Sequence, residues 1–114
     1  MTAFLTGYAS VWLMLAVKKL AVVEADVAEA AEWYDALQPG LGPRFISSLQ
    51  ALDRVLSSNP YRFSIRFGDI RRLNMRDFPY AIFFSVQDDS VIVLAVLHMR
   101  RDTRELLQRR RRLI

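Results

Sequence analysis

Residues 70–102 read IRRLNMRDFPYAIFFSVQDDSVIVLAVLHMRRD, a run of β-type residues that is entered and left through paired arginines. Within it, residues 80–86 and 91–97 are rich in β-branched and aromatic side chains, and residues 87–90 between them are polar and suit a reversing turn. Apolar side chains fall on both faces of the strands, as in interior strands that are covered on at least part of both faces. The stretch therefore predicts an antiparallel hairpin at the middle of a sheet.

A short strand is predicted just before the hairpin, at residues 70–75. Side-chain alternation places Arg72 and Arg76 on one face of this strand and Arg71 on the other. Two arginines on one polar face are the first indication of a functional surface.

Helices are predicted on the N-terminal side of this sheet. After a first strand at residues 17–23, apolar residues recur at helical spacing over residues 24–37, with acids near the start that suit the helix dipole. Gln-Pro-Gly at residues 38–40 ends this helix, because proline disfavours helical geometry in the residue before it and glycine allows a reversal. A second helix at residues 42–58 completes a helical hairpin. A short basic and amphipathic helix is predicted from Thr103 onward.

Two segments allow more than one interpretation. Trp33 and Tyr34 are compatible with a ligand site, but aromatic residues inside a helical hairpin are more often packing residues, and we expect them in the core and its interfaces. Residues 61–67 alternate between aromatic residues and arginines and favour neither strand nor helix.

The composition excludes several kinds of site. The chain has no cysteine, which excludes disulfides and thiolate metal sites, and the lone His98 cannot build a histidine metal site. No glycine-rich phosphate loop or hydrolase motif occurs, so no cofactor is expected. With 114 residues of which 53% are hydrophobic, the chain is long enough for one domain with its own core.

The charge is unevenly distributed. The net charge is +4, five of the twelve acids lie at residues 24–35, and fourteen of the sixteen bases are arginines from Arg44 onward. A basic half of this kind suggests an anionic partner, either nucleic acid or an acidic protein segment, although a merely solvated basic surface explains the charge equally well. The arginine run at residues 109–112 comes without a recognition-helix pattern, so direct DNA binding is not expected except through a partner complex.

The first sixteen residues carry no charge and precede Lys18 and Lys19. A signal peptide has its positive charge before the apolar run, and a membrane-spanning helix needs about 20 apolar residues. We therefore expect no membrane segment and a cytoplasmic location. Residues 1–16 are interpreted as an apolar extension, translated from upstream of a start at Met14, ahead of a single domain at residues 17–114.

Three segments form a specific combination when they occur in order. AEAAEWYDALQPGLGPRF spans residues 28–45, RRLNMRDFPYAIFF spans residues 71–84, and VIVLAVLHMRRD spans residues 91–102. The Trp-Tyr helix with its Pro-Gly-Leu-Gly turn, the Phe-Pro-Tyr strand entry and the His-x-Arg-Arg ending together resemble the RelE/ParE superfamily of toxins from type II toxin–antitoxin systems. The likeness is closest to the ParE-like branch.

The resemblance implies an α+β fold, with an N-terminal strand and a helical hairpin packed on a twisted antiparallel β-sheet and a short C-terminal helix. It also implies a cognate antitoxin that wraps an extended or helical segment around the toxin. Two activities share this scaffold, and the fold alone does not choose between them. Members similar to RelE cut messenger RNA in the ribosome, whereas members similar to ParE poison DNA gyrase.

The residues needed for RNA cleavage are incomplete. Cleavage requires proton transfer and stabilisation of charge at the phosphate. RelE-like enzymes are described as using clustered lysines and arginines with a tyrosine near the C-terminus, but this chain has no lysine after Lys19 and no tyrosine after Tyr80. A ribonuclease would have to rely on His98 with Arg72 and Arg76, and arginine is a poor general base.

His98 itself has two interpretations. Histidine ionises near neutral pH and can transfer protons. Strand alternation, however, places His98 on the same face as the apolar Leu94 and Val96, so a hydrogen-bonded structural histidine is the favoured interpretation.

The sequence thus favours a ParE-like toxin that is not an enzyme, binds DNA gyrase and is neutralised by a cognate antitoxin. The alternatives are a ribosome-dependent mRNA endoribonuclease and a decayed, non-toxic module that only binds an antitoxin. Binding of the target or the antitoxin is expected at the residues that border the hairpin, namely Arg71, Arg72, Arg76, His98, Arg100 and Arg101.

Overall fold

The computed structural model describes residues 14–114, so most of the predicted extension at residues 1–16 lies outside the described residues. In chain order the elements are β1 (Ala16–Lys19), α2 (Ala21–Leu37), α3 (Leu41–Ser58), the short 3₁₀ helix η1 (Pro60–Arg62), β2 (Ile65–Phe67), β3 (Ile70–Asn74), β4 (Tyr80–Gln87), β5 (Ser90–His98) and α4 (Arg104–Arg111). The predicted α+β order of strand, helical hairpin, strands and C-terminal helix is confirmed.

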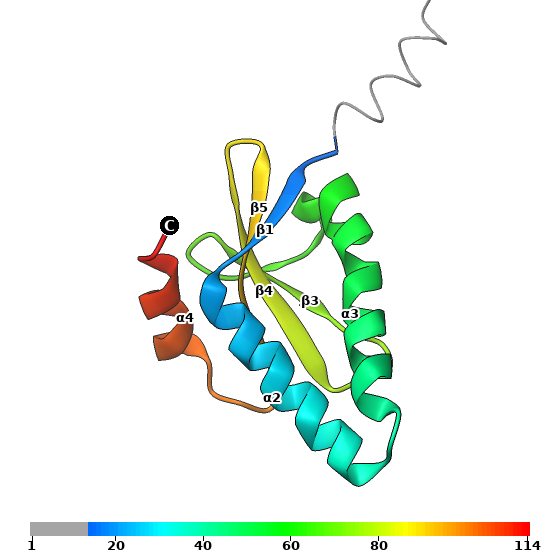
Figure 1. Cartoon of the computed structure of the whole chain (residues 1–114). Coiled ribbons are helices and arrows are strands. Elements are labelled where there is room, and N and C mark those ends of the chain that lie inside the picture. Colours follow the sequence, from blue (N-terminus) through cyan, green and yellow to red (C-terminus); the bar gives the residue numbers. More distant parts are fainter. Residues whose placement is uncertain (1–13) are drawn as a thin grey trace, which may run out of the picture.

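The five strands form one sheet in the order β1-β5-β4-β3-β2 (Figure 1). The pairs β2–β3, β3–β4 and β4–β5 are antiparallel, whereas β1 joins β5 in parallel. The sheet is therefore mixed. β1 is joined to its neighbour β5 only after the helical hairpin and three further strands have intervened in the chain. Between Met14 and Ile114, none of the helices is long and apolar enough to cross a membrane.

The central hairpin is the one that the sequence predicts, with a tighter turn. Gln87 pairs with Ser90, which leaves Asp88 and Asp89 as the turn, and Asp88 has a φ of 54°, in the left-handed region that two-residue hairpin turns favour. β4 and β5 are largely buried on both faces, as expected for interior strands.

One feature of β5 corrects the sequence interpretation. The register shifts between Phe83, which pairs with Ala95, and Phe84, which pairs with Val93, so Leu94 is an extra, bulged residue. The bulge resets the alternation, and Leu94 packs in a different apolar cluster from Val96. The prediction that Leu94 shares the face of His98 was therefore wrong, whereas Val96 does lie on that face.

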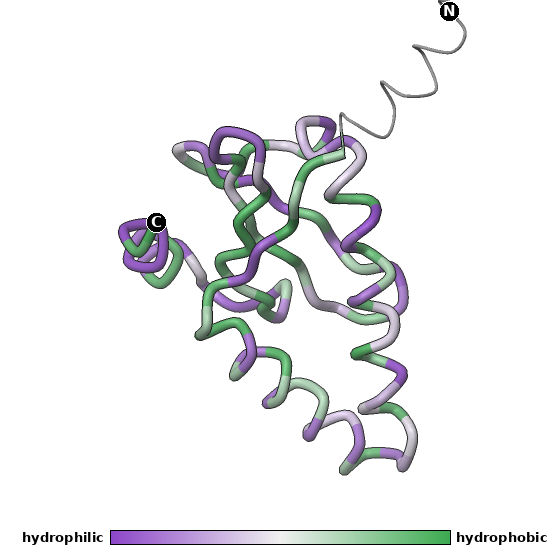
Figure 2. Tube along the Cα trace, turned by 45° about the horizontal axis from the view of Figure 1, so that its top comes forward, coloured by the Kyte–Doolittle hydropathy of each residue, from purple (hydrophilic) through white to green (hydrophobic). Residues whose placement is uncertain are grey.

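The helical hairpin covers one face of the sheet through an aromatic cluster. Phe45 of α3 is fully buried, and its ring centroid lies 5.5 Å from Tyr34, 5.2 Å from Phe78 and 5.2 Å from Tyr80. In Figure 2 the central strands are coloured mainly as hydrophobic, which agrees with a core between sheet and hairpin. We call this side of the sheet the hairpin face.

The Pro-Gly-Leu-Gly turn explains how the two helices approach each other. Gly40 has a φ of 96°, and Asp35 Oδ1 accepts hydrogen bonds from the backbone N–H groups of Gly40 (2.9 Å) and Gly42 (3.1 Å). A Cβ atom at Gly42 would lie 2.8 Å from the carbonyl oxygen of Ala31, so glycine allows the close crossing of α2 and α3.

The opposite face of the sheet is covered more thinly, by α4. Leu107 is fully buried there against an apolar cluster that includes Ile70, Phe83 and Leu97. We call this side the α4 face.

Several predicted boundaries differ from the structure. The first strand ends at Lys19 and α2 already begins at Ala21, because the β-branched run around Val22 does not distinguish a strand from a buried first helical turn. Trp33 is 58% exposed, so it is not a core residue, whereas its neighbour Tyr34 is 7% exposed. Of the undecided residues 61–67, Tyr61 and Arg62 belong to η1, and Ile65–Phe67 form β2.

Candidate functional site

Four of the six predicted site residues come together at one end of the sheet. Tyr80, at the start of β4, pairs with His98, at the end of β5, while Met75 N–H donates to the carbonyl of Tyr80 (2.9 Å) and Met99 N–H donates to that of Pro79 (2.9 Å). These bonds hold the β3–β4 loop beside the turn after β5. Within these two connections lies the sheet-end cluster, which we define as Arg76, His98, Arg100 and Arg101.

His98 organises the turn that carries two of these arginines. Its Nδ1 accepts a hydrogen bond from Arg100 N–H (3.1 Å), and its carbonyl accepts one from Arg101 N–H (3.0 Å). The ring also meets Tyr80 edge to face, with centroids 5.3 Å apart. His98 is therefore hydrogen-bonded in the way expected of a structural histidine.

A small polar cleft of about 70 Å³ lies beside the cluster, between α2 and the ends of β4 and β5. Burial raises the pKa of the Tyr80 hydroxyl and the nearby Glu29 carboxylate raises it further, while Arg101 acts in the opposite direction. Sequence reasoning missed Tyr80 as part of this site, because it continues the apolar alternation of β4. Its position as the first residue of the strand, directly after Phe-Pro, was the signal that it borders a loop.

Arg71 lies away from this cluster and has a structural role. It extends from β3 and its Nη1 donates to the carbonyls of Tyr61 (3.0 Å) and Phe63 (2.6 Å), while its guanidinium lies 5.3 Å from the Tyr61 ring centroid. These contacts fix the segment between α3 and β2.

Arg72 lies on the other side of the sheet from His98. Arg72 pairs with Phe83, which packs in the cluster on the α4 face, whereas His98 pairs with Tyr80, which packs against the core of the hairpin face. The side chains needed for the ribonuclease alternative, His98 with Arg72 and Arg76, are thus divided between two faces of the sheet.

An ion pair that no sequence pattern indicated locks three elements together. Asp26 of α2 binds Arg110 of α4 through two bonds of 2.6 and 3.0 Å, with both side chains nearly buried. The same two side chains also hydrogen-bond to the backbone at the bulge: Val96 N–H donates to Asp26 (3.1 Å), and Arg110 donates to the carbonyl of Leu94 (3.0 Å). The partners are 84 residues apart in sequence, which is why periodicity could not reveal them.

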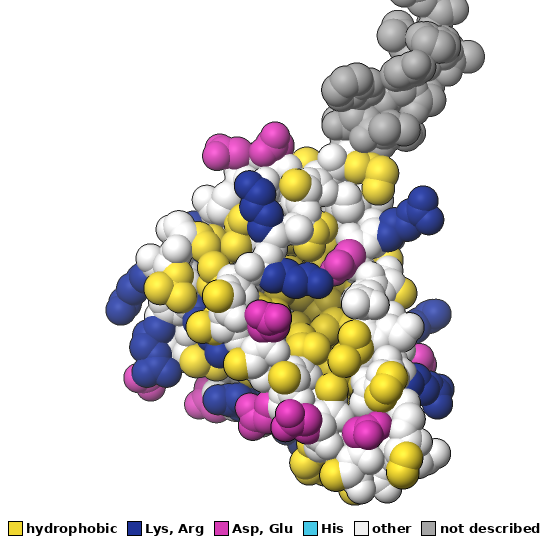
Figure 3. All heavy atoms as spheres, viewed as in Figure 1, with side chains coloured by type: hydrophobic (Ala, Val, Ile, Leu, Met, Phe, Trp, Pro, Cys, Tyr) yellow, Lys and Arg dark blue, Asp and Glu magenta, His cyan; other side chains and the backbone are white. Residues whose placement is uncertain are grey.

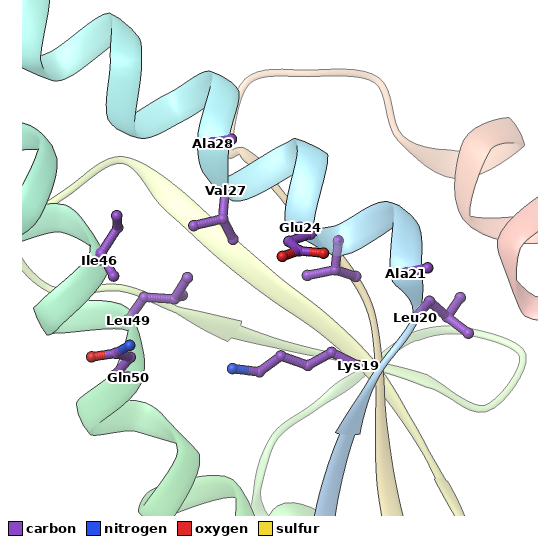
Figure 4. A pocket seen from close by; sticks show the side chains of 10 residues that line it. Lys19, Leu20, Ala21, Glu24, Val27, Ala28, Ile46, Leu49 and Gln50 are labelled. Atoms are coloured by element: carbon purple, nitrogen blue, oxygen red, sulfur yellow. The ribbon is translucent and has the colours of Figure 1, made fainter.

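An apolar groove of about 490 Å³ lies between the two helices of the hairpin and the end of β1. Figure 4 shows Val27 of α2 and Ile46 and Leu49 of α3 lining it, with the Lys19 side chain reaching toward α3. Lys19 Nζ lies 3.2 Å from a carboxylate oxygen of Asp53. In Figure 3 hydrophobic side chains are visible in this hollow, and a basic and an acidic side chain meet over it. We call it the α2–α3 groove.

Comparisons with known proteins agree with the architecture. A family model described as "ParE toxin of type II toxin-antitoxin system, parDE" matches residues 17–103. Among solved structures, the chain is similar to a chain from the "Chromosomal ParDE TA system from P. aeruginosa", with a TM-score of 0.68 and 16% identity, covering 75% of this chain and 97% of that one. At this identity the structural likeness concerns the fold. A comparison with curated protein sequences found no match.

Proposed function

Because the chain belongs to the ParE toxin family of type II toxin–antitoxin systems, we propose that it arrests growth in the cytoplasm by binding DNA gyrase without cleaving RNA, and that a cognate antitoxin neutralises it. The observation that carries the non-enzymatic part is the position of Arg72 on the opposite side of the sheet from His98. Catalysis of phosphodiester cleavage needs these groups around one phosphate.

The sheet-end cluster is the proposed contact with gyrase. Arg76, Arg100 and Arg101 are exposed at this end of the sheet. The fixed turn after His98 reduces the loss of backbone freedom on binding, and exposed arginines are frequent anchors of protein interfaces. Its positive charge favours an acidic surface of the partner.

A supercoiling assay with purified gyrase and the purified full chain tests the proposal. We expect inhibition that saturates with toxin, and about a tenfold higher half-inhibitory concentration when Arg76→Gln and Arg100→Gln are combined. The matched control combines Arg44→Gln and Arg54→Gln, which remove the same charge from exposed positions of α3. Normal supercoiling at saturating toxin, or an equal loss in the control, contradicts the proposal. Cleavage of messenger RNA in a purified translation system would favour the ribonuclease instead.

The α2–α3 groove is the proposed docking site of the antitoxin. Its lining is apolar, and Ile46 on its wall is 36% exposed although it faces other apolar side chains. A type II antitoxin is a protein that binds its toxin directly, and apolar side chains of one antitoxin segment would fill this groove. Burying exposed apolar surface supplies affinity of about 25 cal/mol per Å² before the costs of association.

Ile46→Glu separates toxicity from neutralisation. A charge in the groove should lower affinity for the antitoxin at least tenfold while leaving gyrase inhibition unchanged, because no residue of the sheet-end cluster lines the groove. Co-expression with the product of the adjacent upstream reading frame provides the measurement, as rescue of growth. The control Ile65→Glu places the same charge at a position of β2 that is 52% exposed, and it should still be rescued. Full rescue of Ile46→Glu rules the groove out.

A further inference from the structure

Arginines of α4 and of its C-terminal end line a cavity on the α4 face of the sheet. The cavity has a volume of about 400 Å³ and lies between the β2–β3 turn and α4. Its lining includes Phe67, Asp69, Arg104, Gln108, Arg111 and Arg112. Neither the sheet-end cluster nor the α2–α3 groove contributes a residue to it.

Two guanidinium groups on this face lie over aromatic rings. The guanidinium carbon of Arg104 is 5.5 Å from the ring centroid of Phe67, and that of Arg72 is 5.8 Å from the ring centroid of Phe83. Both rings pack in the same apolar cluster, so both guanidinium groups lie on the same face of the sheet. Arg72 is further fixed by its Nε, which donates to Asn74 Oδ1 (2.7 Å). Each guanidinium group therefore lies over an aromatic ring of this apolar cluster.

The positive charge of this surface is only partly neutralised. Asp69 is the acid that lines the cavity, and Arg111 already binds it through two bonds of 2.9 Å. Within residues 14–114, neither Arg72 nor Arg104 forms an ion pair. Burial lowers the pKa of Arg72, and repulsion from the nearby Arg66 lowers it further. An anionic ligand beside Arg72 would offset this repulsion.

We propose that this arginine face, defined as Arg72, Arg104 and Arg112, binds single-stranded nucleic acid. The guanidinium groups would neutralise phosphates, and the outer planes of Arg72 and Arg104 would stack on unpaired bases, as arginine planes do in single-strand recognition. A duplex hides its base faces and cannot use these planes. This interaction goes beyond gyrase binding, involves a different face of the sheet and needs no cleavage chemistry.

Sequence reasoning did not expect direct DNA binding because it weighed the terminal arginine run at residues 109–112 alone. In the fold, Arg110 and Arg111 of that run are engaged by Asp26 and Asp69. The fold instead brings Arg72 of β3 to the same face as Arg104 at the start of α4, two residues that are distant in sequence.

Fluorescence anisotropy with the full chain tests the proposal, using labelled dT and rU decamers, an abasic decamer and a blunt duplex. We expect at least one of the two base-bearing decamers to bind about fivefold more tightly than both the abasic decamer and the duplex. Combining Arg72→Gln with Arg104→Gln should weaken this binding at least tenfold. It should also reduce the slope of log K against log salt by about 1.4, since each phosphate contact on a single strand contributes about 0.7.

The combination of Arg44→Gln and Arg54→Gln on α3 is again the matched control, and it should change the affinity less than twofold. Thermal melting of both double variants verifies that the fold is intact. The proposal is overturned if the wild-type chain binds no decamer, if the abasic decamer or the duplex binds as tightly as the base-bearing strands, or if the control loses as much affinity as the Arg72 and Arg104 pair. No gyrase is present in this assay, so its outcome is independent of the supercoiling result.

Discussion

The two faces of the sheet are covered by different kinds of interaction. On the hairpin face, α2 and α3 bury a continuous apolar core in which Phe45 contacts three other aromatic rings. On the α4 face, one eight-residue helix is held by the buried Leu107 and by the ion pairs of Arg110 with Asp26 and of Arg111 with Asp69. The hairpin face is stabilised mainly by buried apolar area, and the α4 face by one buried leucine and two ion pairs.

This difference explains where the arginines are. The sequence of α4, RELLQRRR, is too basic for the helix to bury much apolar surface. Its packing on the sheet therefore depends on two acids, Asp26 of α2 and Asp69 of the β2–β3 turn. The remaining arginines stay available to partners. The hairpin face, in contrast, supplies the fold and one apolar groove.

The largest effect is expected from Phe45→Ala on the hairpin face. Removing a fully buried ring from the aromatic cluster should lower the free energy of unfolding by about 3–5 kcal/mol, because the loss of apolar burial adds to the cavity left behind. Urea unfolding of both proteins gives the value. Trp33→Ala is the control, since that aromatic ring is 58% exposed and its loss should change stability by less than about 1 kcal/mol. Equal effects would mean that the cluster is not the core.

On the α4 face, Asp26→Asn should lower the free energy of unfolding by about 2–3 kcal/mol. The change removes the charge that satisfies the nearly buried Arg110 and weakens the bond to Val96 N–H. Hydrogen exchange should also quicken at Leu107 N–H, which donates to the carbonyl of Thr103, the residue directly before α4.

The control for this substitution is Glu32→Gln, which removes the same charge from an exposed position of the same helix. It should leave both stability and exchange nearly unchanged. A similar loss in the two variants would show that α4 is not held by the buried pair.

The two faces also differ in how far the sequence predicts them. The helical hairpin and the β4–β5 hairpin follow from periodicity and turn residues, since local patterns determine both. The bulge at Leu94 could not be predicted, because residues 91–97 are apolar on both faces and a shift of one residue leaves the pattern unchanged.

The candidate site was predicted only in part for a related reason. Arg76, His98, Arg100 and Arg101 lie at the same end of the sheet because β3 and β5 flank β4, both run antiparallel to it, and both end beside its first residues. The half-buried Arg71 and Arg72 could not be told from exposed binding residues. The carbonyls that accept hydrogen bonds from Arg71 belong to Tyr61 of η1 and to Phe63, in a segment whose fold the sequence left open.

A smaller effect, and one that depends on pH, is expected at Asp69. The hydrogen bond from Arg111 lowers the pKa of this carboxyl to about 2, although partial burial opposes the shift. A lowered pKa in the folded state stabilises the protein above the ordinary value of 3.8, and this stabilisation is lost as the pH falls toward about 2. Because the Asp69 side chain is 49% exposed, solvent screening limits the contribution to about 1 kcal/mol or less.

Asp69→Asn should therefore be destabilised by up to about 1 kcal/mol at pH 7 and should match the wild-type chain near pH 2, as measured by urea unfolding at both pH values. Arg111→Gln removes the other partner and should reproduce the loss at pH 7. A difference that persists at pH 2 would assign the effect of Asp69 to its bonds with Ser85 and Gln87.

The smallest effect is expected for the ion pair of Lys19 and Asp53, on the hairpin face beside the α2–α3 groove. Both side chains are 40% exposed, so water screens the attraction and ordering two long side chains offsets most of it. A double-mutant cycle with Lys19→Ala and Asp53→Ala should give a coupling below about 0.5 kcal/mol. The same cycle on Asp26 and Arg110 should give a coupling several times larger, because those side chains are only 9% and 14% exposed. If the two couplings were equal, burial would not be what distinguishes these two ion pairs, and α4 would have to be held by Leu107 and the ion pair of Arg111 with Asp69.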